Sequence, residues 1–146
     1  MLCDLRIVGG LAVVLMGLGC GKSRDEQARL LVETARRIDP DAPPSERRSA
    51  VERLRALPLA EPALAEVRET CVQGHDALLE AESQQDRARR LLEVLERGGG
   101  SGAAGGSQVR QALDASEAAL GRARPLLERC QSRLARLERG PRRRAP

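Results

Sequence analysis

The stretch "LAEVRETCVQGHDALLEAESQQDRARRLLEVL", residues 64–95, decides the fold. It has no proline, and small or apolar side chains recur along it at steps of three and four, the spacing of one face of a helix. Pro62 lies just before it and suits a first helical turn, where its missing N–H is harmless. The stretch therefore predicts one long helix from about Glu61 to Arg97.

A second long helix is expected after a glycine-rich break. The break is "GGGSGAAGGS", residues 98–107, whose composition is typical of a flexible loop. The helix should run from about Ser107 to Arg139, where Gly140 and Pro141 end it. Two long helices joined by a short loop pack antiparallel, so residues 61–139 are predicted to form an antiparallel helical hairpin.

The two helices can be paired in one register. With the turn centred near residues 100 and 101, the facing positions advance by three and four on both helices, the pattern of a coiled-coil seam. In eight of the nine layers both residues are apolar, glycine or cysteine, and in the ninth layer both are polar. The pairs are Leu64/Leu137, Val67/Leu134, Cys71/Cys130, Gly74/Leu127, Leu78/Ala123, Ala81/Leu120, Gln85/Ser116, Ala88/Leu113 and Leu92/Val109.

One level of this hairpin should be weak. Pro125 lacks an N–H and its ring clashes with the carbonyl of Gly121, while Gly74 lies at the same height on the other helix. A bend is expected there, as a tolerated kink or as a hinge.

Two short helices are predicted before the hairpin, within residues 20–60. Ser23 and Glu26 form the pattern of a capping box, so a first helix should begin there and run to about Ile38. The run "DPDAPP", residues 39–44, ends it. Ser45 is expected to cap a second helix, which Pro58 ends. The predicted fold class is all-α, a long antiparallel coiled-coil-like hairpin with one or two short N-terminal helices.

Composition limits what this chain can do. Charged residues make up 32% of the 146, there is no aromatic residue, and the formal net charge is +4. The core must be a thin one of leucine, valine and alanine. Without aromatic rings the chain cannot stack nucleobases, so no nucleic-acid partner is expected.

Two glycine motifs resemble nucleotide-binding loops but do not fit them. In "LMGLGCGKSRDE", residues 15–26, Gly21-Lys22-Ser23 match the end of a P-loop, but Met16 stands where its first glycine belongs. Gly100, Gly102 and Gly105 have dinucleotide-fingerprint spacing, but the segment before them is helical, where the fingerprint needs a strand.

The N-terminus is similar to a secretory leader. The apolar run from Ile7 to Gly19 is shorter than the roughly 20 residues that span a bilayer, and it has the length of a signal-peptide core. It ends in small residues and Cys20, which resembles the lipobox of bacterial lipoprotein precursors. Gly19 fits the small position before the cleavage site, whereas Gly17 stands where that family usually has an aliphatic residue.

The lipobox resemblance implies a lipid anchor. Residues 1–19 would be the signal peptide, cleavage would leave Cys20 as the first residue, and its thiol would carry diacylglycerol, with palmitate-type acyl chains holding the protein at the membrane. Two acyl chains suffice for stable anchoring. Gly21 after the cysteine favours the periplasmic face of the outer membrane over the inner membrane in that family.

Two of the four cysteines then remain for a disulfide. Cys3 leaves with the leader and Cys20 carries lipid, so Cys71 and Cys130 can pair only with each other. The seam register places them at one level, and thiols outside the cytoplasm oxidise and persist. The alternative is a thiol or zinc site built from Cys71, Cys130 and His75, the only histidine.

The sequence thus predicts a non-enzymatic, membrane-tethered lipoprotein of the cell envelope, a structural or interaction module without cofactor or metal. The membrane is the expected first partner, through the lipid. Envelope proteins or anionic envelope polymers are the other candidates, the latter through the basic tail at residues 140–146. A cytoplasmic coiled-coil module, whose start is not a signal, is the other open alternative.

Overall fold

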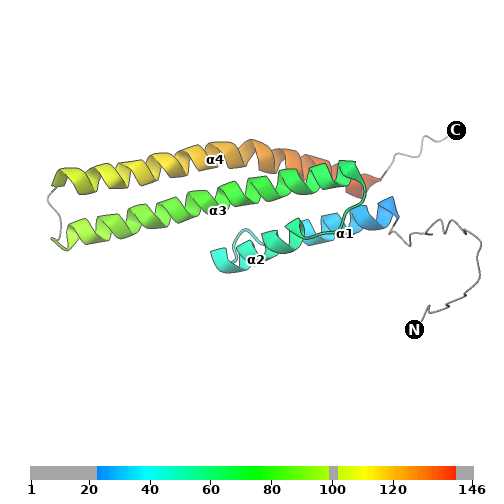
Figure 1. The fold of residues 1–146 in the computed structure, drawn as a ribbon, viewed down its shortest axis with the longest axis horizontal. Coiled ribbons are helices and arrows are strands. Elements are labelled where there is room, and N and C mark those ends of the chain that lie inside the picture. The colour runs from blue at the N-terminus through cyan, green and yellow to red at the C-terminus, as the bar shows by residue number, and fades with distance from the viewer. Residues whose placement is uncertain (1–22, 99–101, 141–146) are drawn as a thin grey trace, which may run out of the picture.

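The computed structural model describes residues 23–98 and 102–140, and this part of the chain is all-helical. Helix α1 spans Arg24–Arg36, α2 spans Pro44–Arg55, α3 spans Pro62–Glu96 and α4 spans Gly102–Arg139. Figure 1 shows α3 and α4 side by side as a long hairpin, with α1 and α2 along the side of α3. The predicted fold class is therefore correct, and both short N-terminal helices are present.

Local sequence signals set the start of α1. The hydroxyl of Ser23 accepts the backbone N–H of Glu26, and the Glu26 carboxylate accepts the N–H of Ser23 at 2.8 Å. This is the predicted capping box, and it satisfies two donors that a helix start leaves without partners.

The start of α2 differs from the prediction. Its N-cap is Pro43, Pro44 is the first helical residue, and no side chain caps it, so Ser45 is not the cap. The hydroxyl of Ser49 instead donates to the carbonyl of Ser45 at 3.0 Å. Because proline fixes φ near its helical value and needs no N–H partner in a first turn, Pro44 starts the helix two residues earlier than a Ser45 cap would.

The loop between the long helices is shorter than predicted. Helix α4 begins at Gly102, so residues 102–107 of the expected flexible break are helical. Leu95 of α3 lies so close to Gly105 that a Cβ there would collide with it. Glycine at 105 therefore lets the first turn of α4 pack against the end of α3.

The predicted register is correct and most of the predicted seam is buried, but three of its leucines are exposed. Leu92, Leu113 and Leu120, all expected in the seam, are 45%, 49% and 40% exposed. Gln85, the expected polar partner of Ser116, is also exposed. The residues buried along this part of the hairpin are mostly small. Five belong to the predicted seam, and three lie one position before an expected seam leucine: Ala77, Ala112 and Ala119.

The two helices pack at an ordinary separation. The Cα atoms of Cys71 and Cys130 are 4.9 Å apart, and because each Cα lies about 2.3 Å from its helix axis, the axes there are about 9–10 Å apart, as in most packed helices. Small residues occupy the inner positions of the distal half. The exposed leucines lie on the flank of the pair.

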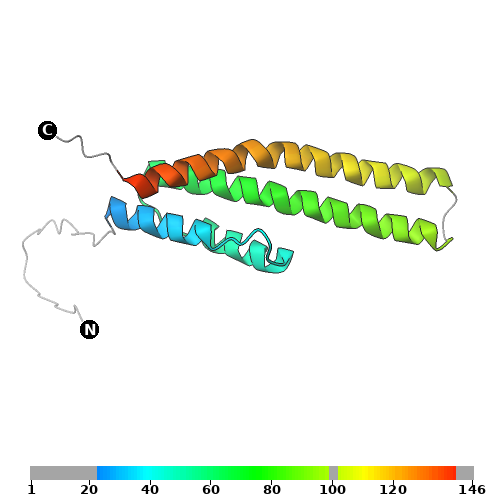
Figure 2. The same cartoon turned by 180° about the vertical axis from the view of Figure 1, so that it is seen from behind.

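The larger hydrophobic core lies in the half of the hairpin that α1 and α2 cover. There Leu31, Val51 and Leu54 are almost fully buried against Leu64, Val72 and Cys71. Toward the loop, the second cluster contains only Ala88, Val109 and Ala112, with Leu91 and Leu95 packed against it. Figure 2 shows from behind that α1 and α2 end well short of the loop, so the distal half of the hairpin is two helices wide.

Pro125 lies inside α4 without ending it. The ribbon of α4 is curved, and its course changes in its orange part in Figure 1. This curvature agrees with the predicted bend. Gly74 faces this region: a Cβ on it would lie 2.9 Å from Cδ2 of Leu127.

Candidate functional site

A buried disulfide joins α3 to α4. Cys71 and Cys130 are bonded across 59 positions of sequence, and both are almost fully buried, at 0% and 3% exposed. This is the pairing that the sequence predicts. They lie in the larger core, next to Leu64, Val67 and Val72, so solvent does not reach the bond. The arrangement suits a structural clamp rather than an exposed redox centre.

His75 does not lie in a metal-binding arrangement. Both cysteine sulfurs are committed to the disulfide, and His75 sits half-buried where α3 meets α2. No group of three or more histidine, cysteine or acidic side chains within residues 23–98 and 102–140 could hold a metal ion. Burial lowers the pKa of His75, nearby Arg47 lowers it further, and Asp76 acts in the opposite direction.

Ionic contacts attach α2 to α3 around this histidine. Arg47, only 6% exposed, donates to both carboxylate oxygens of Glu82, and its Nε donates to the carbonyl of Ala42 at 3.0 Å. The hydrogen bond to Glu82 raises the pKa of Arg47, although burial opposes it. Arg55 of α2 donates to Asp76 at 2.5 Å. These bonds fix where α2 lies along α3.

Gln27 fixes the start of α3 in the same way. It is buried in α1, and its Oε1 accepts the backbone N–H groups of Ala60 at 2.8 Å and Glu61 at 3.3 Å. Glu61 is the N-cap of α3 and has no side-chain cap of its own. A buried side chain of one helix thus satisfies donors at the beginning of another.

Sequence reasoning missed both of these buried polar residues. The signal was their spacing: Arg47 precedes Ala50 and Leu54, and Gln27 precedes Leu31 and Ala35, at helical steps along the buried faces. A polar residue in such a position must find partners, because burying it without them is costly.

A charged groove lies between α1 and the end of α4. It has a volume of about 780 Å³, and its lining includes the apolar residues Val32 and Leu137. Four arginines and three acidic residues line it: Arg24, Arg29, Arg36, Arg136, Asp25, Glu33 and Glu138. Arg36 and Glu138 form an ion pair across it at 2.5 Å. It lies at the hairpin end opposite the loop, where the described chain both begins and ends (Figure 1).

The remaining predicted sites lie outside the described residues. These are the signal peptide at 1–19, the lipidation site Cys20, and the basic tail beyond Gly140. Within the helices that the structure describes, none is long and apolar enough to cross a membrane.

No family model matches the chain, and neither a curated protein nor a solved structure is significantly similar to it. The site must therefore be interpreted from its own geometry.

Proposed function

We propose that this chain is a lipid-anchored protein of the bacterial cell envelope, which presents a disulfide-clamped helical hairpin as a non-enzymatic structural or interaction module. The anchor would be Cys20, as the lipobox resemblance implies. The favoured location is the periplasmic face of the outer membrane.

The observation that carries the proposal is where α1 begins. Ser23 caps α1 only three residues after Cys20, and three extended residues span at most about 10 Å. A lipid on Cys20 would therefore hold the end of the hairpin that contains the charged groove close to the lipid headgroups. From there α3, with 35 residues, would extend about 50 Å.

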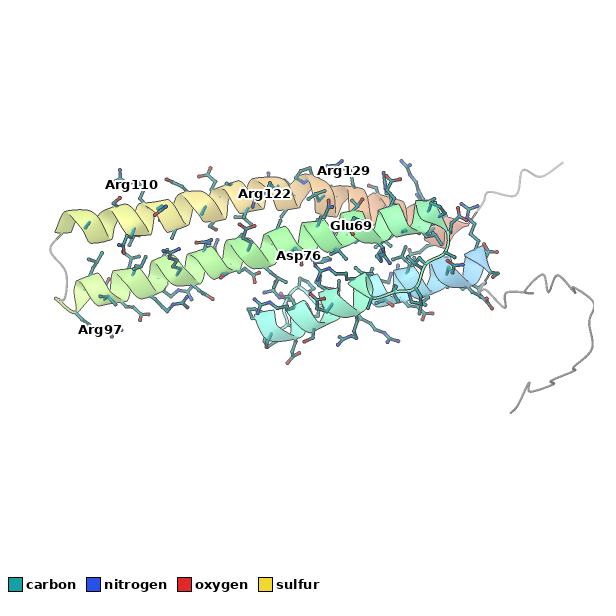
Figure 3. All side chains as sticks on the ribbon, viewed as in Figure 1. Glu69, Asp76, Arg97, Arg110, Arg122 and Arg129 are labelled. Carbon is teal, nitrogen blue, oxygen red and sulfur yellow. A yellow bond between two sulfur atoms is a disulfide. The ribbon has the colours of Figure 1, made fainter. Side chains whose placement is uncertain are left out.

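The chemistry of the described surface supports a non-enzymatic role. His75 faces an ionic cluster, the cysteines form a buried disulfide, and charged side chains of both signs cover the outer faces of α3 and α4 (Figure 3). Seven ion pairs within the described residues join these side chains to one another or to the N-terminal helices. Such an arrangement favours a stable scaffold that contacts other molecules through its surface.

The mature N-terminus tests the proposal. Mass analysis of the protein from envelope fractions should give a chain beginning at Cys20 with a diacylglycerol adduct. Cys20→Ser should give an uncleaved precursor or a soluble secreted form, whereas Cys3→Ser should behave as wild type. If Cys20→Ser still fractionates with membranes at mature length, or if the wild type retains residues 1–19 in the cytoplasm, the proposal is wrong.

A further inference from the structure

Positive charge is concentrated at the C-terminal end of the sequence. Residues 129–146 contain seven arginines and a single acidic residue, Glu138, so their net charge is +6. The formal net charge of the whole chain is +4, which means that the first 128 residues carry a net charge of −2. Such a difference in charge between two parts of a chain indicates contact with an anionic partner, such as a membrane or a nucleic acid.

Four of these arginines form one face of α4. They are spaced by four, three and three residues, so they lie within about a third of the helix circumference, along about 15 Å of helix. Three of the side chains are exposed and one is half-buried. We call this surface the basic face; it consists of Arg129, Arg133, Arg136 and Arg139. The sequence continues after Gly140 with three more arginines, at 142–144.

Nearby acidic side chains compensate little of this charge. Arg133 pairs with Glu66 of α3 at 2.8 Å. Glu138, the acidic residue of this segment, pairs with Arg36 of α1 at 2.5 Å. The other arginines of the basic face take part in no ion pair within residues 23–98 and 102–140; these are Arg129, Arg136 and Arg139. Their charge is therefore available to another molecule.

The helix dipole accounts for only part of this arrangement. Cations in the last turn of a helix stabilise its carbonyl end, and Arg136 and Arg139 lie in that turn. The effect falls off within one turn, whereas Arg129 precedes Arg136 by seven residues, about two turns. Arginines 142–144 follow the end of α4 in the sequence. Because the arginines extend on both sides of the last turn, we look for a partner outside the chain.

The basic face lies at the same end of the hairpin as the start of α1. Arg136 and Gly140 line the charged groove together with Arg24, the first residue of α1. A lipid on Cys20 would hold this end of the hairpin within about 10 Å of the lipid headgroups. That distance is close to the Debye length at physiological ionic strength, so charges at this end act on the membrane surface.

We propose that the basic face binds the phosphate groups of anionic phospholipids, so that the end of α4 rests on the membrane that carries the lipid anchor. This inference rests on the proposed function for the membrane, to which it adds a second, electrostatic contact. Arginine suits phosphate because its guanidinium donates two parallel hydrogen bonds to it. Near an anionic surface each arginine strengthens binding about fivefold. With the lipid at the start of α1, the two attachments would restrict the tilt of the hairpin.

Vesicle flotation tests the contact without the lipid. The protein is the chain from residue 20 onward with Cys20→Ser, which contains every described residue and lacks the apolar leader that would itself enter vesicles. It should float with vesicles of equal parts phosphatidylglycerol and phosphatidylcholine, and not with phosphatidylcholine alone. High salt should release it, because salt screens exposed charges. Failure to bind the anionic vesicles at physiological salt would overturn the proposal.

A triple variant tests the basic face itself. Arg129→Gln, Arg136→Gln and Arg139→Gln together should weaken binding to the anionic vesicles at least tenfold. All three side chains are exposed, so circular dichroism should show unchanged helicity. Unchanged binding by this variant would contradict the proposal.

The matched control removes the same charge from the other end of the hairpin. Arg87→Gln, Arg89→Gln and Arg90→Gln also replace exposed side chains. Arg87, the closest of them, is sixteen residues from Cys71, which is bonded to Cys130 next to the basic face. This separation is about 24 Å along α3, more than two Debye lengths, so binding should weaken less than threefold. Equal losses in both triple variants would show that only net charge matters, and would reject a contact through the basic face.

The results separate this inference from the proposed function. If the native N-terminus carries diacylglycerol but the chain without lipid does not bind the vesicles, the anchor stands and the contact of the basic face is wrong. If the vesicles bind and the native protein carries no lipid, the basic face stands as the contact with phospholipid and the anchor is wrong. Duplex DNA that binds more tightly than the vesicles, with the same loss in the first triple variant, would assign the face to nucleic acid and overturn the lipid contact.

Discussion

At the scale of single residues, glycine decides how closely α3 and α4 approach. A Cβ at Gly74 would lie 2.9 Å from Cδ2 of Leu127, 3.1 Å from its Cγ and 3.2 Å from Cβ of Leu126. The last of these atoms is held by the backbone and cannot simply rotate away. At Gly121, by contrast, an added Cβ meets nothing within 4 Å.

These two glycines make a matched pair for a stability measurement. Replacing glycine by alanine inside a helix contributes roughly 1 kcal/mol of stability where there is space. Gly121→Ala should therefore raise the free energy of unfolding by about 1 kcal/mol. Gly74→Ala should lower it by ~1–3 kcal/mol, because overpacking outweighs propensity. Urea denaturation measures both, and equal shifts in the same direction would show that the contact at Gly74 relaxes without cost.

Ser116 is the second residue whose role is specific to this packing. It is 3% exposed, and its hydroxyl has no hydrogen-bond partner within the described structure. A buried polar group without a partner costs about 1–3 kcal/mol. Ser116→Ala should therefore raise the free energy of unfolding by ~1 kcal/mol or more, while Ser107→Ala, at an exposed helical position, should change it little. A drop in stability for Ser116→Ala would mean that the hydroxyl is satisfied in solution.

At the scale of elements, the disulfide determines the stability of the hairpin. It closes a loop of 59 residues between α3 and α4, for which the chain-entropy model gives about 4 kcal/mol. Stability of small domains is typically 5–15 kcal/mol, and this core has no aromatic side chain. The bond therefore supplies a large part of the total.

The double variant Cys71→Ala/Cys130→Ala should lower the free energy of unfolding by about 4 kcal/mol and the melting temperature by tens of degrees. Thermal unfolding by circular dichroism measures this in the chain with and without the bond. Two alanines still fit the close approach, so native helicity should persist at low temperature. Unfolding curves that coincide would show that the clamp is dispensable.

At the scale of the whole molecule, attachment of the N-terminal layer should depend on pH. Arg47 of α2 and Asp76 of α3 are the charged groups that act on half-buried His75, and burial and Arg47 both lower its pKa below 6.5. The unfolded chain therefore binds this proton more readily than the folded one. The contribution of His75 is fully present above pH 6.5 and is lost as the pH falls below that value.

The free energy of unfolding should accordingly decrease between pH 7.5 and pH 5.5, and less steeply in His75→Gln, which cannot take up a proton. Denaturant titrations at each pH compare the slopes. Arg47→Met offers a further check, because removing that cation brings the pKa of His75 closer to its ordinary value. Identical slopes in wild type and His75→Gln would show that other groups control the pH response.

Much of this architecture follows from the sequence alone. Proline and glycine placement and the steps of three and four give the helices, the capping box gives the start of α1, and the register gives the Cys71–Cys130 pair. These signals are local, or they depend only on two antiparallel helices whose paired residues lie at equal sequence distances from the centre of one loop. They need no knowledge of how far apart the helices lie.

The tertiary structure alone decided which of two neighbouring positions lies between the long helices. Steps of three and four are consistent with a seam of leucines or with a seam of alanines, because each of these alanines lies one position before a leucine. In the structure Ala112 and Ala119 are buried, and Leu113 and Leu120, each one position later, are exposed. Likewise the partners of Gln27 and Arg47 lie more than thirty residues away in sequence, at Ala60 and Glu82, so only the packing of α1 and α2 on α3 brings them together.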